Sequence, residues 1–196
     1  MIRRPHGADF APGAYVFPGG AVRPDDSESG DANRSAAVRE LFEEVGILLA
    51  RAGRRFARER DGEKVRTVVA GGSTFGQALR GCGLEPAHDR LVNLARWVTP
   101  AQLRRRFDAL FFLARLPSGQ AITPQEGEVT DWLWITPAQA LADPKITLVY
   151  ATRMVLESVA TGDDAAAVFA RARRQLHMPA VEPRLVQTEA GWEIVR

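Results

Sequence analysis

Apolar residues recur at the helical period in one segment near the first quarter of the chain. The residues that form this stripe are Ala37, Val38, Leu41, Phe42 and Val45. Their spacing, at i, i+1, i+4, i+5 and i+8, predicts an amphipathic helix at residues 32–45. Gly46 follows, where a left-handed conformation can end a helix. The turn-forming residues of 23–31 predict a loop before it.

Further apolar runs predict strands that alternate with helices. We expect strands at residues 14–17, 91–98, 107–116 and 129–135. Helices are expected at residues 74–80, from Thr136 onward, and at 146–159 and 165–176, followed by a hairpin at 184–195 that turns at Ala190. This order predicts an α/β fold in which helices pack against a mixed β-sheet.

The length of 196 residues fits one domain, so we predict a single domain at residues 1–196. Within it, we interpret residues 50–90 as an insertion or lid and 146–196 as a helical and hairpin extension. Residues 1–4 have the character of the end of a strand, because Ile2 precedes two arginines and Pro5. We therefore expect the apolar beginning of that strand upstream.

Composition excludes several classes of protein. No apolar run approaches the roughly 20 residues of a membrane span, and residues 1–5 lack the apolar core of a secretory signal. We therefore expect a cytoplasmic protein without a membrane partner. Cys82 is the one cysteine, which excludes an internal disulfide and a cysteine-based zinc site. No histidine lies close to it in sequence, which argues against a catalytic thiol.

The charge balance gives little support for nucleic-acid binding. The formal net charge is +2, and arginine supplies all basic residues except Lys64 and Lys145. Basic runs at residues 51–60, 104–106 and 171–174 lack the interleaved aromatic residues of a stacking platform. We interpret them as solvated faces and expect no nucleic-acid partner. Some of these arginines could still meet substrate phosphates.

Three glutamates share one face of the predicted helix. Glu40, Glu43 and Glu44 lie within about one turn, opposite the apolar stripe. Like charges at this spacing weaken a helix, and a broken local rule often marks a functional site. Carboxylate oxygens are also what Mg²⁺ requires. Arg39 lies one turn before Glu43, well placed for a charge-assisted hydrogen bond. From spacing alone, a solvated acidic face is an equal alternative.

The string from Arg39 to Ile47 resembles the second half of the Nudix box, R-E-U-x-E-E-x-G-U, at every fixed position. The resemblance implies a Nudix fold, α/β/α with a mixed sheet sandwiched between helices, and metal-dependent hydrolysis of a diphosphate bond. It assigns Glu40, Glu43 and Glu44 to Mg²⁺, with Mn²⁺ as a substitute. The implied catalytic residues are Glu43, Glu44, Glu40, Arg39 and Glu128. One of the box glutamates, or Glu128, would act as the general base.

The first half of the box departs from the family pattern. The family has G-x5-E-x7-R, whereas the segment from Gly20 to Arg39 is about five residues longer. Asp26 has the x5 spacing from Gly20, and Asp31 has the x7 spacing to Arg39. Either aspartate could stand for the first glutamate.

Flanking segments resemble one branch of the family, the peroxisomal coenzyme A diphosphatases and their bacterial homologues. These segments are residues 12–20, 95–100 and 106–112. The best expectation for the substrate is therefore coenzyme A or acyl-coenzyme A, giving 3′,5′-ADP and a phosphopantetheine species. The alternatives are ADP-ribose, NADH, a nucleotide sugar, a dinucleoside polyphosphate, or a ligand-sensing module without catalysis.

The partner would be a small-molecule nucleotide, and a homodimer stays open. The candidate substrate-binding residues are Gly19, Gly20, Glu126 and Phe17. Family members often bring a glutamate to the metals or the attacking water from the region of Glu128, for which Glu126 is the reserve and a plain exposed loop the alternative. Strand aromatics usually face inward, so we expect four aromatic residues in the core: Trp97, Phe107, Phe111 and Phe112.

Overall fold

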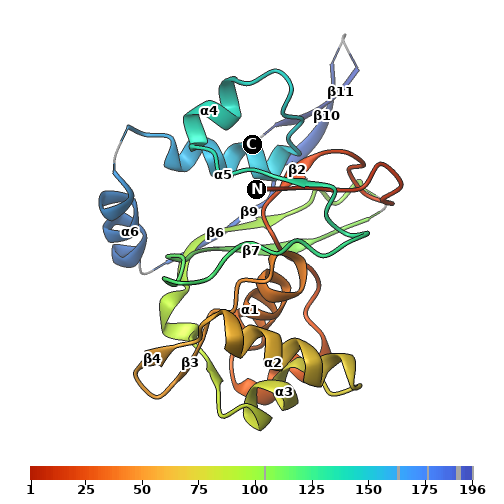
Figure 1. Cartoon of the computed structure of the whole chain (residues 1–196). Helices are drawn as coiled ribbons and strands as arrows, with labels where there is room; N and C mark the ends of the chain where they lie inside the picture. Colours follow the sequence, from red (N-terminus) through yellow and green to blue (C-terminus); the bar gives the residue numbers. More distant parts are fainter. Residues whose placement is uncertain (104, 163, 176, 189–190, 196) are drawn as a thin grey trace. The chain divides into compact units, whose positions relative to one another are not determined.

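The computed structural model describes residues 1–103, 105–162, 164–175, 177–188 and 191–195 (Figure 1). The chain divides into two compact units. The first comprises Met1–Leu91 with Ala114–Trp134, and the second comprises Val92–Leu113 with Ile135–Arg196. Whether the two form one domain stays a prediction. In the described part of the chain, no helix is both long and apolar enough to cross a membrane.

A small antiparallel sheet begins the first unit. Strand β1 (Ile2–Arg3) lies between β2 (Tyr15–Val16) and β8 (Asp131–Trp132). The strand predicted at 129–135 is thus only two residues long, and both of its residues are exposed, while Val129 before it is buried in the core. The core beside this sheet consists of Ile2, Val45, Ile47 and Val129.

Helix α1 (Ala32–Val45) confirms the predicted helix, ends included. The Asp31 carboxylate accepts a hydrogen bond from the Arg34 backbone N–H, as an N-cap does. Gly46 has a φ of 75° and donates its N–H to the Phe42 carbonyl, which ends the helix. The apolar stripe is buried through Val38, Phe42 and Val45.

The segment before α1 was predicted as a loop, and the structure corrects this. Residues Pro24–Ser29 form a 3-10 helix, η1. Proline at the first position has a φ suited to a helix start. The Asp26 carboxylate accepts the Arg23 backbone N–H at 2.7 Å, so a local side chain stabilises the first turn.

Residues 50–90 are an ordered part of the first unit. They form the antiparallel sheet β4-β3-β5 with helices α2 and α3, which lie side by side (Figure 1). The bounds are β3 (Ala50–Ala52), β4 (Arg55–Phe56), α2 (Glu59–Ala70), α3 (Phe75–Gly81), β5 (Glu85–Pro86) and the 3-10 helix η2 (His88–Arg90). Helix α3 was predicted, and Thr74 caps it; α2 was not. Val65 and Leu79 are fully buried, so the segment contributes to the core.

The second unit is built on a mixed sheet. Strand β6 (Val92–Val98) pairs antiparallel with β7 (Asp108–Leu113) and parallel with β9 (Ala180–Val181). Three helices follow β7: α4 (Pro137–Ala142), α5 (Tyr150–Val159) and α6 (Ala165–Arg174). Phe169 and Ala172 of α6 pack against Val92 and Leu113 of the sheet.

The expectations for the second unit are met only in part. The helix predicted from residue 146 begins at Tyr150, because the Ile146 N–H bonds to Asp143 in a turn. Strands β10 (Arg184–Thr188) and β11 (Gly191–Val195) pair antiparallel, but the predicted turn residue Ala190 lies outside the described residues. Trp97 is buried as predicted, whereas Phe111 and Phe112 are half-buried and Phe107 is 38% exposed. The core assignment of Phe107 was therefore wrong.

Candidate active site

The carboxylates of α1 are mostly withdrawn from water. Glu40 is 9% exposed and Glu44 is 8% exposed, while Glu43 is half-buried. An acidic face that merely keeps a helix soluble would be open to solvent. Burying carboxylates costs free energy unless partners compensate. The reading as a solvated face is therefore wrong for Glu40 and Glu44.

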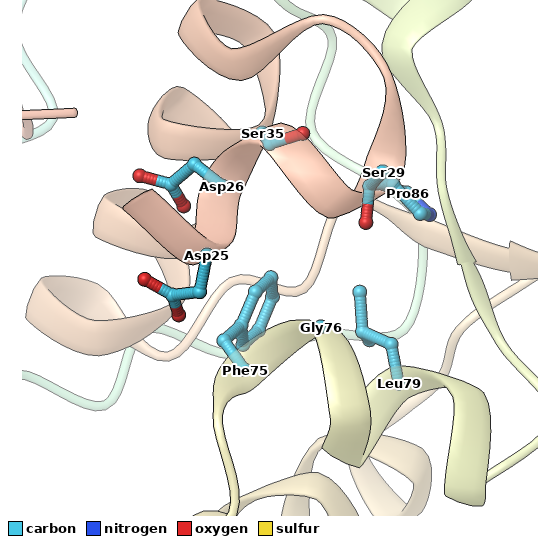
Figure 2. A pocket seen from close by; sticks show the side chains of 8 residues that line it. All are labelled: Asp25, Asp26, Ser29, Ser35, Phe75, Gly76, Leu79 and Pro86. Carbon is cyan, nitrogen blue, oxygen red and sulfur yellow. The ribbon is translucent and has the colours of Figure 1, made fainter. Parts of the chain in front are cut away.

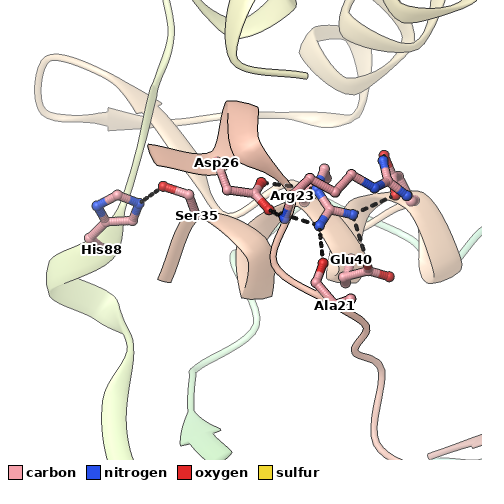
Figure 3. A network of polar contacts seen from close by, with 8 residues as sticks. Ala21, Arg23, Asp26, Ser35, Glu40 and His88 are labelled. Atoms are coloured by element: carbon pink, nitrogen blue, oxygen red, sulfur yellow. Dashed lines mark hydrogen bonds and ion pairs between the residues drawn. The ribbon is translucent and has the colours of Figure 1, made fainter. Parts of the chain in front are cut away.

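Arg39 joins these carboxylates, and Figure 3 shows Asp26 and Glu40 in the network of contacts. Its side chain is fully buried, and it donates to Asp26, Glu40 and Glu43. The predicted bond to Glu43 runs from Nη1 to Oε2 at 2.9 Å, and Nη2 also donates to the Ala21 carbonyl at 2.9 Å. Burial alone would lower the pKa of Arg39, but the hydrogen bonds that it donates to Asp26 and Glu40 raise that pKa above its usual value. Arg39 is thus a buried, permanently charged residue that joins the three carboxylates.

The structure also decides between the two aspartates left open by the sequence. Asp26 meets Arg39 twice, with Nε to Oδ1 at 3.0 Å and Nη2 to Oδ2 at 2.9 Å. Burial opposes the charge of Asp26, but the hydrogen bond from Arg39 and that from the Arg23 N–H leave its pKa below the usual range. Asp31 instead caps α1. The aspartate with the x5 spacing therefore takes the place of the first box glutamate.

The two glycines predicted to bind substrate lie directly against the glutamates. The Gly19 N–H donates to Glu44 Oε2 at 2.8 Å. A Cβ atom at Gly20 would overlap the Glu40 carboxylate, so a larger residue there would displace Glu40. Both glycines are exposed, which leaves them accessible to a substrate. Phe17, the third candidate, is half-buried.

Glu44 has a pKa well above its usual value. Desolvation by burial, with the charges of Glu40 and Glu128, raises the pKa of Glu44 to about 7. Glu128, the other predicted glutamate, is exposed on a loop, and its place in the site stays a prediction. Glu126 is exposed on the same loop, and no interaction links it to the box glutamates. Crowded carboxylates of this kind are relieved by a cation.

The fit to a divalent metal is partial. Across the residues that the structure describes, no group of three or more His, Cys, Asp or Glu side chains is arranged to hold a metal ion. Both Glu43 oxygens accept from arginines, Oε1 from Arg23 and Oε2 from Arg39. Glu40 and Glu44 each have one oxygen without such a partner among the described residues. Mg²⁺ is commonly held by one or two carboxylates together with water and phosphate, which these two residues fit.

Two features near the site were not anticipated from the sequence. Arg23 meets Glu43, although an arginine in a turn-rich stretch carries no signal of that contact. Ser35 Oγ lies 3.1 Å from His88 Nε2, at one side of α1 (Figure 3). Ser35 also lines a cavity with room for about one water molecule, beside Asp26 and Phe75 (Figure 2). None of the box glutamates lines this cavity, so it is not the place of the chemistry.

Comparisons with known proteins agree with this geometry. The sequence model described as the NUDT19 Nudix domain matches residues 29–151. The chain is 33% identical over 144 residues to "Putative nudix hydrolase 7" of Caenorhabditis elegans, covering 72% of this chain and 47% of the relative. It is 27% identical over 206 residues to "Acyl-coenzyme A diphosphatase NUDT19" of Xenopus laevis, covering 74% and 54%. The chain thus spans about half the length of these curated relatives.

A solved structure supports the same assignment. The crystal structure of a NUDIX hydrolase from Alicyclobacillus acidocaldarius aligns with a TM-score of 0.70 at 26% identity, over 85% of each chain. This confirms the predicted mixed α/β fold class. The string of residues 39–47 lies inside the matched segment, on α1, where its arginine and glutamates meet. The chain belongs to the Nudix hydrolase family, in the branch of the NUDT19 Nudix domain.

Proposed function

We propose that this Nudix hydrolase cleaves the diphosphate bond of coenzyme A or an acyl-coenzyme A, giving 3′,5′-ADP and a phosphopantetheine species. The observation that carries the hydrolytic site is the buried carboxylate group joined by Arg39. The substrate is supported by the relatives from Xenopus laevis and Gallus gallus, both of which are named acyl-coenzyme A diphosphatases. The chain is 31% identical to the second over 132 residues, 56% of this chain and 35% of that relative.

The roles of the residues follow from their surroundings. Nudix hydrolases typically depend on a divalent metal; Mg²⁺, or Mn²⁺ in its place, would neutralise charge on the phosphates and acidify water. Glu40 and Glu44 would hold it, because each has an oxygen that accepts no hydrogen bond from the residues that the structure describes. Arg39 fixes the direction of Glu40 and Glu43, and Gly19 fixes Glu44.

In the reaction, a water oxygen forms a bond to phosphorus while the bridging P–O bond breaks. The leaving phosphate departs with the electron pair of that bond. The proton of the water goes to a carboxylate, which would be one of the box glutamates or Glu128, exposed on its loop. A carboxylate within reach of the water can serve as a general base.

The test is a substrate panel with phosphate release measured after coupling to a phosphatase. The panel contains coenzyme A, an acyl-coenzyme A, ADP-ribose, NADH, a nucleotide sugar and a dinucleoside polyphosphate. We expect turnover with Mg²⁺, none after exhaustive EDTA treatment, and the highest kcat/KM for coenzyme A or its acyl derivative. A kcat/KM at least tenfold higher for ADP-ribose would assign the chain to that substrate instead.

A matched pair of variants tests the site itself. Glu44→Gln should lower kcat by at least about 10²-fold, comparable to the loss of a major electrostatic contact. Glu28→Gln is the control, because Glu28 is exposed and pairs with Arg80 outside the carboxylate group. Circular dichroism should be unchanged in both. A loss below tenfold for Glu44→Gln would remove Glu44 from the principal ligands.

A further inference from the structure

Two arginines meet Glu43, and they differ in access to solvent. Arg23 Nη1 donates to Glu43 Oε1 at 2.9 Å, and 51% of the Arg23 side chain is exposed. Arg39 donates to the other oxygen and is fully buried, with its guanidinium surrounded by protein acceptors. Arg39 therefore cannot reach a substrate. Arg23 is a cation at the edge of the carboxylate group that can.

Hydrogen bonds hold the backbone of Arg23, while about half of its side chain is exposed to solvent. The Arg23 N–H donates to Asp26 Oδ2 at 2.7 Å, and the Asp26 N–H donates to the Arg23 carbonyl at 3.1 Å. The same carboxylate of Asp26 binds Arg39. The backbone of Arg23 is therefore joined to the framework of the site, from which its guanidinium reaches Glu43.

A diphosphate substrate is stabilised by a cation that balances its negative charge. A substrate that brings two phosphates beside Glu40, Glu43 and Glu44 adds negative charge to an acidic surface. The guanidinium fork matches phosphate oxygens in a bidentate way. The bond to Glu43 uses one of the five N–H donors of Arg23, so donors remain for a ligand. An exposed ion pair of this kind contributes little, so exchanging Glu43 for phosphate is not costly.

We propose that Arg23 is a phosphate-binding residue of this active site, which holds non-bridging oxygens of the diphosphate substrate through its guanidinium. The inference rests on the proposed function, and it adds to the substrate-binding residues a side chain that the box pattern does not contain. The competing role is that Arg23 only orients Glu43. The two roles predict different kinetic changes, because a residue that binds the phosphate acts on substrate affinity.

The experiment compares Arg23→Ala and Arg23→Lys with the control Arg80→Ala. Arg80 is matched because 53% of its side chain is exposed and it also forms one ion pair, to Glu28 at 2.7 Å. Steady-state kinetics with coenzyme A at several Mg²⁺ concentrations give KM, kcat and the half-saturating Mg²⁺. Calorimetric titration with ADP measures diphosphate binding without turnover.

We expect Arg23→Ala to raise KM about tenfold or more, with kcat within about threefold and half-saturating Mg²⁺ unchanged. Its ADP affinity should fall by a similar factor. Arg23→Lys should recover part of this, and Arg80→Ala should match the wild type. A lower kcat or a raised half-saturating Mg²⁺ at constant KM would overturn the proposal in favour of orienting Glu43; wild-type values throughout would also overturn it.

The two proposals fail in different ways. If the wild type turns over none of the diphosphates, the proposed function fails on that result alone. The ADP titration then still decides the role of Arg23: reduced affinity in Arg23→Ala, but not in Arg80→Ala, supports phosphate binding, and equal affinity refutes it.

Discussion

The bond between Asp26 and Arg39 should be among the most stabilising contacts of the first unit. Replacing Asp26 by Ala removes two charge-assisted hydrogen bonds of 2.9 and 3.0 Å from a guanidinium that has no exposed surface. It also removes the acceptor of the Arg23 N–H at the start of η1. Arg39 would then be a buried charge with fewer partners.

The magnitude follows from this burial. Removing one partner of a buried ion pair typically costs about 3–5 kcal/mol, because the remaining charge is left uncompensated. Arg39 keeps its bonds to Glu40, Glu43 and the Ala21 carbonyl, so we expect the lower end of that range, about 3 kcal/mol. That is a large fraction of the roughly 5–15 kcal/mol that stabilises a domain.

Urea unfolding followed by circular dichroism measures the effect. The matched control is Glu28→Ala, which breaks an exposed ion pair with Arg80 and should cost about 0–1 kcal/mol. Both variants should keep the wild-type dependence of the unfolding free energy on urea, which shows that the same surface unfolds. A cost below about 1 kcal/mol for Asp26→Ala would refute the reasoning that Arg39 depends on this carboxylate.

Three further predictions concern the carboxylates. Gly20→Ala should displace Glu40 and lower kcat at least about tenfold, whereas Gly7→Ala, with open space around it, should not. Because the folded pKa of Glu44, about 7, exceeds the ordinary 4.5, its ionisation destabilises the fold as pH rises through that window. In EDTA, the free energy of unfolding of Glu44→Gln should therefore increase relative to that of the wild type from pH 5 to pH 8, on the order of 3 kcal/mol by urea unfolding. A difference between the two proteins that stays constant over this range contradicts the prediction. Glu128→Gln should lower kcat roughly tenfold, and an unchanged kcat would leave Glu128 as a surface residue.

Local signals explain which elements could be predicted. Helix α1 has an apolar stripe, an N-cap at Asp31 and a left-handed Gly46, so each local signal predicts the same helix with the same ends. Helix α2 has its apolar residues Val65, Val68 and Val69 only in its second half, so the helical pattern is short. Its position depends on packing within the unit, which the local sequence does not encode.

The sequence was sufficient to predict the residue types of the site, but only one of its contacts. The spacing of Arg39 and Glu43 by one helical turn was sufficient to predict their hydrogen bond. Spacing could not choose between Asp26 and Asp31, because the path of η1 decides which carboxylate reaches Arg39. Arg23 was missed for the same reason: its partner lies 20 positions away, across a turn whose shape no pattern specifies.

The η1 segment has a consequence for how relatives of this chain are recognised. Asp26 lies in the first turn of η1 and Arg39 lies in α1, and their side chains meet although the rest of η1 and the cap of α1 lie between them in sequence. Gly30, just before Asp31, has a φ of 99°, a conformation that favours glycine, and no atom lies within 4 Å of the position of a Cβ atom. The contact with the arginine, and not the number of residues before it, therefore identifies the first acidic position of the box in this chain. A search pattern that allows a variable gap between the acidic residue and the arginine would match Asp26, which the fixed seven-residue spacing does not.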